Sequence, residues 1–220
     1  MNPLTIALPK GRLLEPAADL FRRLGWPCDL GNGSRQLLVT EANAADGSRG
    51  DVRFLLAKPA DVPVYVEYGA ADLGIVGQDV LWESGRDVYE PLQLGFGRCR
   101  LALAGTPAQQ GRNFRLATGL RVATKYPRLA RAHFQKQGLS VEIIPLAGSI
   151  ELAPLVGLAD LLVDLVETGR TLRENGLAEL ETLVGCQATL IVNRVSHRLR
   201  LAEIRRLLAD LETLTQGGAP

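Results

Sequence analysis

The residues best suited to chemistry follow an apolar run late in the chain. Leu161–Val166 is typical of a buried strand, with Asp164 near its end, and Glu167–Thr171 follows it before a short helix. Such a turn can direct consecutive backbone N–H groups at a phosphate, with Thr168 and Thr171 as hydroxyl donors. Asp164 could face a ribose hydroxyl or a Mg²⁺ ion. An ordinary strand-to-helix turn with a threonine cap explains the pattern equally well.

Two other turns could also approach a ligand. Lys10-Gly11-Arg12 lies between a predicted strand and a predicted helix, and its two cations suit a polyphosphate. Taken alone, two solvated charges at a turn are the commoner explanation of this pattern. The glycines in the segment 69–79 permit close backbone approach at a strand end, where open α/β sheets bind ligands. Tight helix–sheet packing explains those glycines equally well.

Other kinds of site have little support in the sequence. The chain has neither a GxGxxG nor a Walker A motif, so a dinucleotide-binding enzyme and a mononucleotide ATPase are disfavoured. Its cysteines (Cys28, Cys99 and Cys186) and histidines (His133 and His197) are isolated, without metal-ligand spacing, and we expect the cysteines to be buried, reduced thiols. The sequence offers two strand-to-helix turns that could bind phosphate, and no good nucleophile or general base. That combination suits group transfer between phosphorylated substrates.

Charge and hydropathy limit the class of partner. With 25 basic and 24 acidic residues the net charge is +1, and no Lys/Arg block stands out, so we expect no nucleic-acid partner. The opening residues enter a strand-like run directly, which predicts neither a signal peptide nor a membrane span. We therefore expect a cytoplasmic protein.

The elements that position these turns alternate between strand and helix. Strands are predicted at 4–8, 52–56, 72–76, 121–124, 141–144 and 161–166. Helices are predicted from the end of the Lys10-Gly11-Arg12 turn to residue 25 and at 59–68, 77–84, 127–138, 149–157 and 200–214. The polar segments 41–50 and 106–119 are predicted to be exposed loops. This alternation indicates βαβ crossovers and parallel sheets, and leaves one doubly wound domain and two lobes equally open.

Five stretches, in this order, resemble the ATP phosphoribosyltransferase family in its short form, along nearly the whole chain. They are Ile6–Leu13, Asp61–Val66 running on to Ala71–Gly77, Arg121–Pro127, Gly148–Pro154 and Asp164–Leu172. The resemblance implies an α/β fold with two lobes of the periplasmic-binding-protein type (type II), mostly parallel sheets with flanking helices, and an active-site cleft between the lobes. It places lobe I at 1–95 with 183–215 and lobe II at 96–182. The glycines and proline of 216–220 predict a flexible tail.

The same resemblance implies a site for each substrate, ATP and phosphoribosyl pyrophosphate (PRPP). The PRPP side would comprise Glu151, Asp164, Glu167, Thr168, Gly169, Arg170 and Thr171. The ATP and pyrophosphate side would comprise Lys10, Gly11, Arg12, Asp72, Gly77, Gln78, Asp79 and Lys125. Arg35 and Lys58 would be catalytic. Relatives often carry arginine ahead of the Asp-Val-Pro segment, where this chain has Lys58, which keeps the charge but not the planar fork.

In the reaction implied by the resemblance, adenine N1 attacks the anomeric carbon of PRPP and pyrophosphate leaves. Mg²⁺ would accompany the pyrophosphate, with Glu151 and Asp164 as its implied ligands. The short form implies a homodimer of catalytic subunits that joins a regulatory subunit related to histidyl-tRNA synthetase, as a hetero-octamer. The alternatives are a non-catalytic two-lobed small-molecule binding protein and another phosphoribosyl or nucleotide-sugar transferase.

Overall fold

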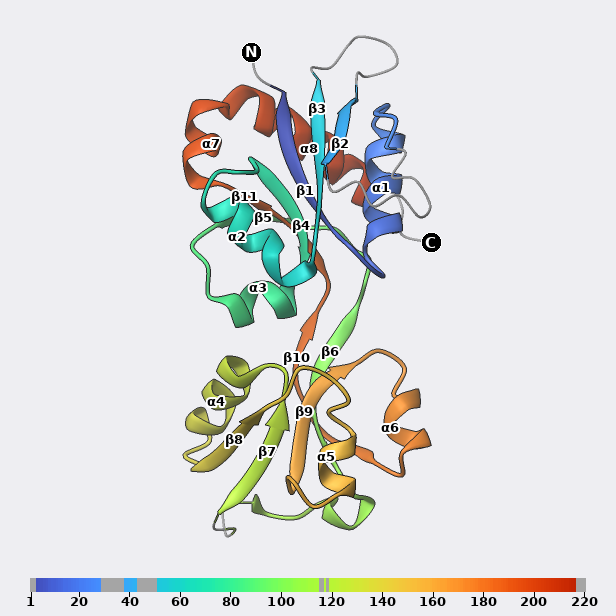
Figure 1. The fold of residues 1–220 in the computed structure, drawn as a ribbon, viewed down its shortest axis with the longest axis vertical. Coiled ribbons are helices and arrows are strands. Elements are labelled where there is room, and N and C mark those ends of the chain that lie inside the picture. Colours follow the sequence, from blue (N-terminus) through green and yellow to red (C-terminus); the bar gives the residue numbers. More distant parts are fainter. Residues whose placement is uncertain (1–2, 29–37, 43–50, 115–116, 118, 217–220) are drawn as a thin grey trace. The chain divides into compact units, whose positions relative to one another are not determined.

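A computed structural model describes residues 3–28, 38–42, 51–114, 117 and 119–216. The chain forms two compact units, of which unit 1 comprises Met1–Gly97 with Gln187–Pro220 and unit 2 comprises Arg98–Cys186. Each unit has its own sheet and its own helices (Figure 1). The chain returns from unit 2 to unit 1 after Cys186, rather than after the predicted residue 182, because β10 continues to pair with β6 as far as Cys186.

Unit 1 contains a six-stranded mixed sheet in the order β2-β3-β1-β4-β11-β5. The strands β3, β1 and β4 are parallel, whereas β2, β11 and β5 join antiparallel. The strands are β1 (Leu4–Pro9), β2 (Leu38–Ala42), β3 (Val52–Ala57), β4 (Leu73–Gly77), β5 (Tyr89–Gln93) and β11 (Ala188–Val192). The helices are α1 (Leu14–Arg23), the 3₁₀ turn η1 (Pro59–Asp61), α2 (Val62–Glu67), α3 (Gln78–Ser84), α7 (Arg194–Leu199) and α8 (Leu201–Gln216).

Alternation along the central strand β1 divides the apolar core of unit 1 between the two faces of the sheet. Ile6 and Leu8 join a cluster that includes residues of α1 and α8, whereas Ala7 joins the cluster of α2 and α3. On the second face Gly74 allows α2 to approach β4, because a Cβ there would lie 2.8 Å from Cγ1 of Val62. The buried faces of this sheet hold the carboxyl ends of its parallel strands in place.

Unit 2 contains a five-stranded mixed sheet in the order β10-β6-β9-β7-β8. The strands β9, β7 and β8 are parallel, and β6 and β10 are antiparallel. Helix α4 packs on one face of this sheet, and α5 and α6 pack on the other (Figure 1). The elements are β6 (Cys99–Gly105), η2 (Pro107–Gln109), β7 (Leu120–Thr124), α4 (Pro127–Lys136), β8 (Val141–Pro145), α5 (Leu152–Leu155), β9 (Leu161–Val166), α6 (Arg170–Glu174) and β10 (Ala178–Cys186).

Three local expectations differ from the structure. The helix predicted at 149–157 forms only as α5, because the backbone of Ser149 adopts φ 51° and Gly157 has φ 72°. The predicted loop 41–50 begins inside β2, and its residues 43–50 lie outside the described part of the chain. The predicted loop 106–119 contains η2, which Thr106 and Gln109 close as a capping box.

Two of the cysteines that look isolated in the sequence lie opposite each other. Cys99 begins β6 and Cys186 ends β10, and the register pairs them directly. Their sulfur atoms are 3.4 Å apart as free thiols. Because they are 87 residues apart in sequence, local spacing could not reveal this pair. None of the helices among the described residues is long and apolar enough to cross a membrane.

Candidate active site

Lysines follow the carboxyl ends of two adjacent parallel strands in unit 1. β1 and β3 pair in register through Pro9 and Ala57, so Lys10 and Lys58 come next at the same edge. The Lys10 amide donates to the Ala57 carbonyl at 2.8 Å, which ties the two turns together. Both lysines are exposed. The structure thus brings together Lys10 and Lys58, which the sequence separates by 48 residues.

The turn after β1 also presents Gly11 and Arg12 at this edge. Gly11 has φ 94°, a backbone conformation that residues other than glycine rarely adopt. Its carbonyl accepts from Leu14 N at 3.0 Å, and Leu13, which follows Arg12, is buried in the core. Anchoring Leu13 therefore leaves the exposed Arg12 on the solvent side of a fixed turn.

The turn after β4 lies at the same edge but is committed to packing. Gln78 is 4% exposed, its Nε2 donates to Glu90, and its Oε1 accepts from Gln187 N. Asp79 is also buried, and a Cβ on Gly77 would collide with its carboxylate. The side chains of Gln78 and Asp79 thus support the start of α3, and the glycine is explained by close packing.

Asp72 lies at the opposite edge of the sheet from these turns, directly before β4. Its carboxylate accepts from Thr5 N at 2.9 Å, Ser196 Oγ at 2.6 Å and Arg200 Nη1 at 3.1 Å. These bonds join the amino ends of β1 and β4 to α7 and α8. The structure therefore does not bring Asp72 to the edge that carries Lys10 and Lys58.

We expect Asp72→Asn to lower the free energy of unfolding by roughly 1–3 kcal/mol, because it weakens a half-buried, charge-assisted network. The kinetic dependence on ATP should stay unchanged. Urea denaturation and ATP titration measure the two quantities. An unchanged stability with a raised KM for ATP would instead place Asp72 in the nucleotide site, as the resemblance implies.

In unit 2, three loops meet at the carboxyl edge of β7, β8 and β9. The strand register aligns Thr124 with Pro145 and with Val163. Thr124, fully buried, donates through Oγ1 to the Val163 carbonyl at 2.7 Å and accepts from Tyr126 N. The structure therefore places the exposed Lys125 at the same edge as the loops that carry Glu151 and 167–171. Lys125 therefore lies in the same unit, and at the same end of the strands, as the residues that the resemblance assigns to PRPP, whereas Lys10 belongs to unit 1.

The loop 167–171 has the geometry of a tight turn. Gly169 adopts φ 71° and precedes the first residue of α6. The Arg170 amide lies 3.4 Å from Thr168 Oγ1, whereas the Arg170 side chain extends into solvent and pairs with Glu174 at 2.7 Å. Thr168 and Thr171 are exposed. The loop thus offers small and hydroxyl side chains around a glycine, which suits close approach by a phosphate.

Asp164 and Glu151 are the carboxylates that the resemblance assigns to Mg²⁺ in this region. Strand alternation places Asp164 on the same face as Leu162 and Val166, and that face packs against residues next to Glu151 and in α6. One Asp164 oxygen accepts from Leu165 N at 2.8 Å. The described residues contain no cluster of three or more His, Cys, Asp or Glu placed to hold a metal. Two carboxylates fit Mg²⁺ where substrate phosphates supply further ligands.

The loop before α5 carries a feature that sequence reasoning missed. Ser149 has φ 51°, the one positive value among the described non-glycine residues. Such strained backbones are often found at ligand sites. Gly148-Ser149 has the composition of a turn, but no residue type at this position signals the left-handed backbone. Arg35 lies outside the described residues, so the structure does not place it.

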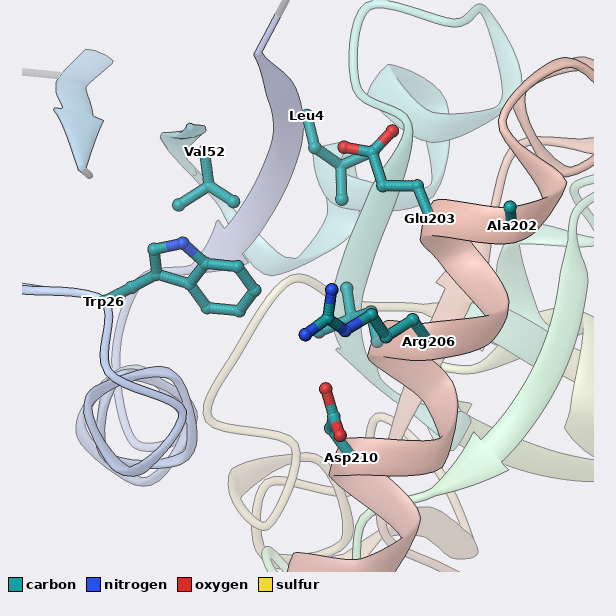
Figure 2. A pocket seen from close by; sticks show the side chains of 8 residues that line it. Leu4, Trp26, Val52, Ala202, Glu203, Arg206 and Asp210 are labelled. Atoms are coloured by element: carbon teal, nitrogen blue, oxygen red, sulfur yellow. The ribbon is translucent and has the colours of Figure 1, made fainter. Parts of the chain in front are cut away.

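A separate pocket of about 300 Å³ lies at the other edge of unit 1. Leu4 and Val52, at the amino ends of β1 and β3, are among the residues that line it. Figure 2 shows Arg206 and Asp210 pointing from α8 into the space opposite Trp26. It contains none of the predicted site residues. The cationic turns after β1 and β3 therefore lie at the opposite edge of the sheet from this cavity.

Comparisons with known proteins identify the family of the chain. The family model for ATP phosphoribosyltransferase matches residues 58–213. The ATP phosphoribosyltransferase of Ruminiclostridium cellulolyticum is 50% identical over 94% of this chain and 95% of its own length. That of Geobacillus kaustophilus is 52% identical over 94% of this chain and 96% of its own length.

Solved structures give the same result. The ATP phosphoribosyl transferase (HisG:HisZ) complex from Thermotoga maritima matches with a TM-score of 0.79 and 32% identity, over 97% of this chain and 99% of that one. The periplasmic aliphatic sulphonate binding protein of Escherichia coli shares the fold, with a TM-score of 0.64 at 14% identity over 99% of this chain and 75% of that one. The predicted periplasmic-binding-protein type of fold is confirmed, and the chain belongs to the ATP phosphoribosyltransferase family.

Proposed function

We propose that the chain condenses ATP with PRPP to N1-(5-phosphoribosyl)-ATP and pyrophosphate, the first step of histidine biosynthesis. Family membership supports this pentosyl transfer. The single structural observation that carries the proposal is the turn at 167–171. Its glycine and threonines lie at the carboxyl edge of the unit 2 sheet, together with the loop that carries Glu151.

The loop 167–171 binds the 5′-phosphate of PRPP in this proposal. Glu151 and Asp164 face the ribose hydroxyls or the metal, and Lys125 contributes a positive charge at the same edge. Lys10, Gly11, Arg12 and Lys58 bind the polyphosphate of ATP or the departing pyrophosphate, with Arg35 assigned by the resemblance alone. Gly77, Gln78 and Asp79 support that edge through packing, which the Gln78 bonds to Glu90 and Gln187 indicate.

The chemistry requires positioning rather than a protein nucleophile. Adenine N1 attacks the anomeric carbon as the bond to pyrophosphate breaks, so negative charge develops on the leaving group. The cations Lys10, Arg12 and Lys58 stabilise that charge. When bound, Mg²⁺ neutralises the pyrophosphate oxygens, and Glu151 and Asp164 are the residues that would hold it.

Pyrophosphate release tests this function. The chain should release pyrophosphate only when ATP, PRPP and Mg²⁺ are all present, and chelation of the metal should stop the release. The closest rival, a two-lobed protein that binds a small molecule without turnover, predicts no release under any of these conditions. If the chain is instead another phosphoribosyl or nucleotide-sugar transferase, PRPP, ATP or both should fail as substrates.

The proposal extends to an assembly in the cytoplasm. The similarity to a chain of the Thermotoga maritima HisG:HisZ complex supports a regulatory partner of the HisZ kind, which is related to histidyl-tRNA synthetase. We propose that the catalytic chain forms a homodimer by itself and a hetero-octamer with that partner. Allosteric control needs a second site whose affinity differs between two states. In this proposal the partner supplies that site, so sensitivity to histidine depends on the partner.

We expect the isolated chain to elute as a dimer and, with an equimolar regulatory subunit, as a hetero-octamer. Size-exclusion chromatography with light scattering measures both masses. Inhibition by histidine should appear only in the mixture. Saturable histidine binding with loss of activity in the isolated chain, or no mass change on mixing, would contradict this assembly.

A further inference from the structure

An arginine from outside the loop 167–171 contacts its first carbonyl group. Arg100, the second residue of β6, lies directly opposite Val166 at the end of β9. Its Nη1 donates to the Glu167 carbonyl oxygen at 3.1 Å. Because Arg100 and the loop are 67 residues apart in sequence, this contact depends on the antiparallel pairing of β6 with β9.

Arg100 is itself held by a carboxylate. Its Nε and Nη2 bind Glu179 of β10 at 2.8 and 2.5 Å, and Thr182 Oγ1 donates to the same carboxylate at 2.7 Å. The hydrogen bond with Arg100 lowers the pKa of Glu179, and the same bond raises the pKa of Arg100. Both groups therefore stay charged through neutral pH, and the guanidinium has a fixed orientation.

A second arginine contacts the next carbonyl of the loop. Arg173, one turn into α6, donates from Nη1 to the Thr168 carbonyl oxygen at 3.0 Å. It reaches that oxygen beside Gly169, where an added Cβ would lie 3.1 Å from the same nitrogen. Glycine at 169 therefore allows both the left-handed turn and the approach of this guanidinium.

Two consecutive carbonyls held in this way determine where the following amides point. In a trans peptide the C=O and the N–H of the next residue point in opposite directions. The bond to the Glu167 carbonyl thus orients the Thr168 amide, and the bond to the Thr168 carbonyl orients the Gly169 amide. Within the described residues neither amide donates to a protein acceptor. Both are oriented away from the arginines that hold the loop.

We propose that Arg100, held by Glu179, and Arg173 are positioning residues for PRPP. They hold the loop 167–171 with the Thr168 and Gly169 amides directed at the 5′-phosphate, without touching the substrate. This inference rests on the proposed function of the loop. It explains why three arginines near the loop differ: Arg100 and Arg173 bind its backbone, whereas Arg170 extends into solvent.

Substitution of the two arginines tests the proposal. Arg100→Gln and Arg173→Gln should each raise the KM for PRPP about ten- to a hundredfold, because each loses a charge-assisted bond that orients a phosphate donor. The KM for ATP should stay within about twofold. Arg100→Lys keeps the charge but not the fork, so its KM for PRPP should lie between those of the parent and Arg100→Gln.

Arg121→Gln is the matched control, because Arg121 pairs with Asp160 at the opposite edge of the same sheet. It should leave the KM for PRPP unchanged. A purely structural role of Arg100 would lower stability and the fraction of active enzyme, without a selective change in the KM for PRPP. Should Arg100→Gln fail to fold, Arg173→Gln and Glu179→Gln give the same test.

Two results would overturn the proposal, and they are distinguishable. Unchanged KM values for PRPP in folded arginine variants, with strong weakening by Gly169→Val, would leave the loop as the phosphate site and remove the positioning role. Unchanged PRPP binding in Gly169→Val as well would remove the proposed function of the loop, and the positioning role with it.

Discussion

Valine at position 169 is expected to weaken PRPP binding by at least about a hundredfold. A β-branched residue is strained at φ 71°, and its side chain would also displace Arg173 from the Thr168 carbonyl. The loop would therefore move and lose its amide contacts with the 5′-phosphate. Calorimetric titration of the folded variant with PRPP measures the change.

Gly176→Val is the matched control for this variant. Gly176 has φ 67° in the same unit, but a Cβ there would meet no atom within 4 Å, and it lies beyond α6. Valine at 176 should therefore impose a similar backbone strain and leave PRPP affinity unchanged. Equal weakening by both variants would trace the effect to general strain, and parental affinity in Gly169→Val would contradict the loop assignment.

The second large effect is expected at the turn after β1. Arg12→Ala should raise the KM for ATP or lower kcat by about tenfold or more, because it removes one charge-assisted contact with a polyphosphate. The exposed Arg12 lies in a turn anchored by the buried Leu13, so the fold should survive. Steady-state kinetics with varied ATP and saturating PRPP gives both constants.

Arg23→Ala provides the comparison for Arg12→Ala. Arg23 is an exposed arginine in the last turn of α1, the helix that follows the same loop. It should show parental kinetics, so a shared effect would indicate a general loss of charge. Parental kinetics in Arg12→Ala would mean that Arg12 is a solvated charge.

The sequence predicts the parallel part of each sheet well. The predicted strands near 4–8, 52–56, 72–76, 121–124, 141–144 and 161–166 correspond to β1, β3, β4, β7, β8 and β9. These strands are apolar and lie between helices, so their pattern is local. The local pattern did not predict β2, β5, β6 or β10, which pair antiparallel. The partners of β5, β6 and β10 are distant in sequence, whereas β2 pairs with the next strand, β3.

Site residues that lie next to their strand in sequence could also be predicted, whereas those brought in by strand pairing could not. Turns that follow a parallel strand directly, such as Lys10–Arg12 and Glu167–Thr171, were recognisable from strand, glycine and charge order. In the glycine-rich segment 69–79, Asp72 lies before β4 and Gln78 lies after it, so the two residues are at opposite ends of the strand. Arg100 could not be found at all, because its contact with Glu167 requires the pairing of β6 with β9.

Identification of the nucleotide product tests the central claim most directly. The chain, incubated with ATP, PRPP and Mg²⁺, should form one phosphoribosyl-ATP for each pyrophosphate released, with the new bond at adenine N1. Mass spectrometry and NMR of the purified nucleotide give the stoichiometry and the position of attachment. Pyrophosphate released with unmodified ATP, or no turnover by the folded chain, would contradict the account.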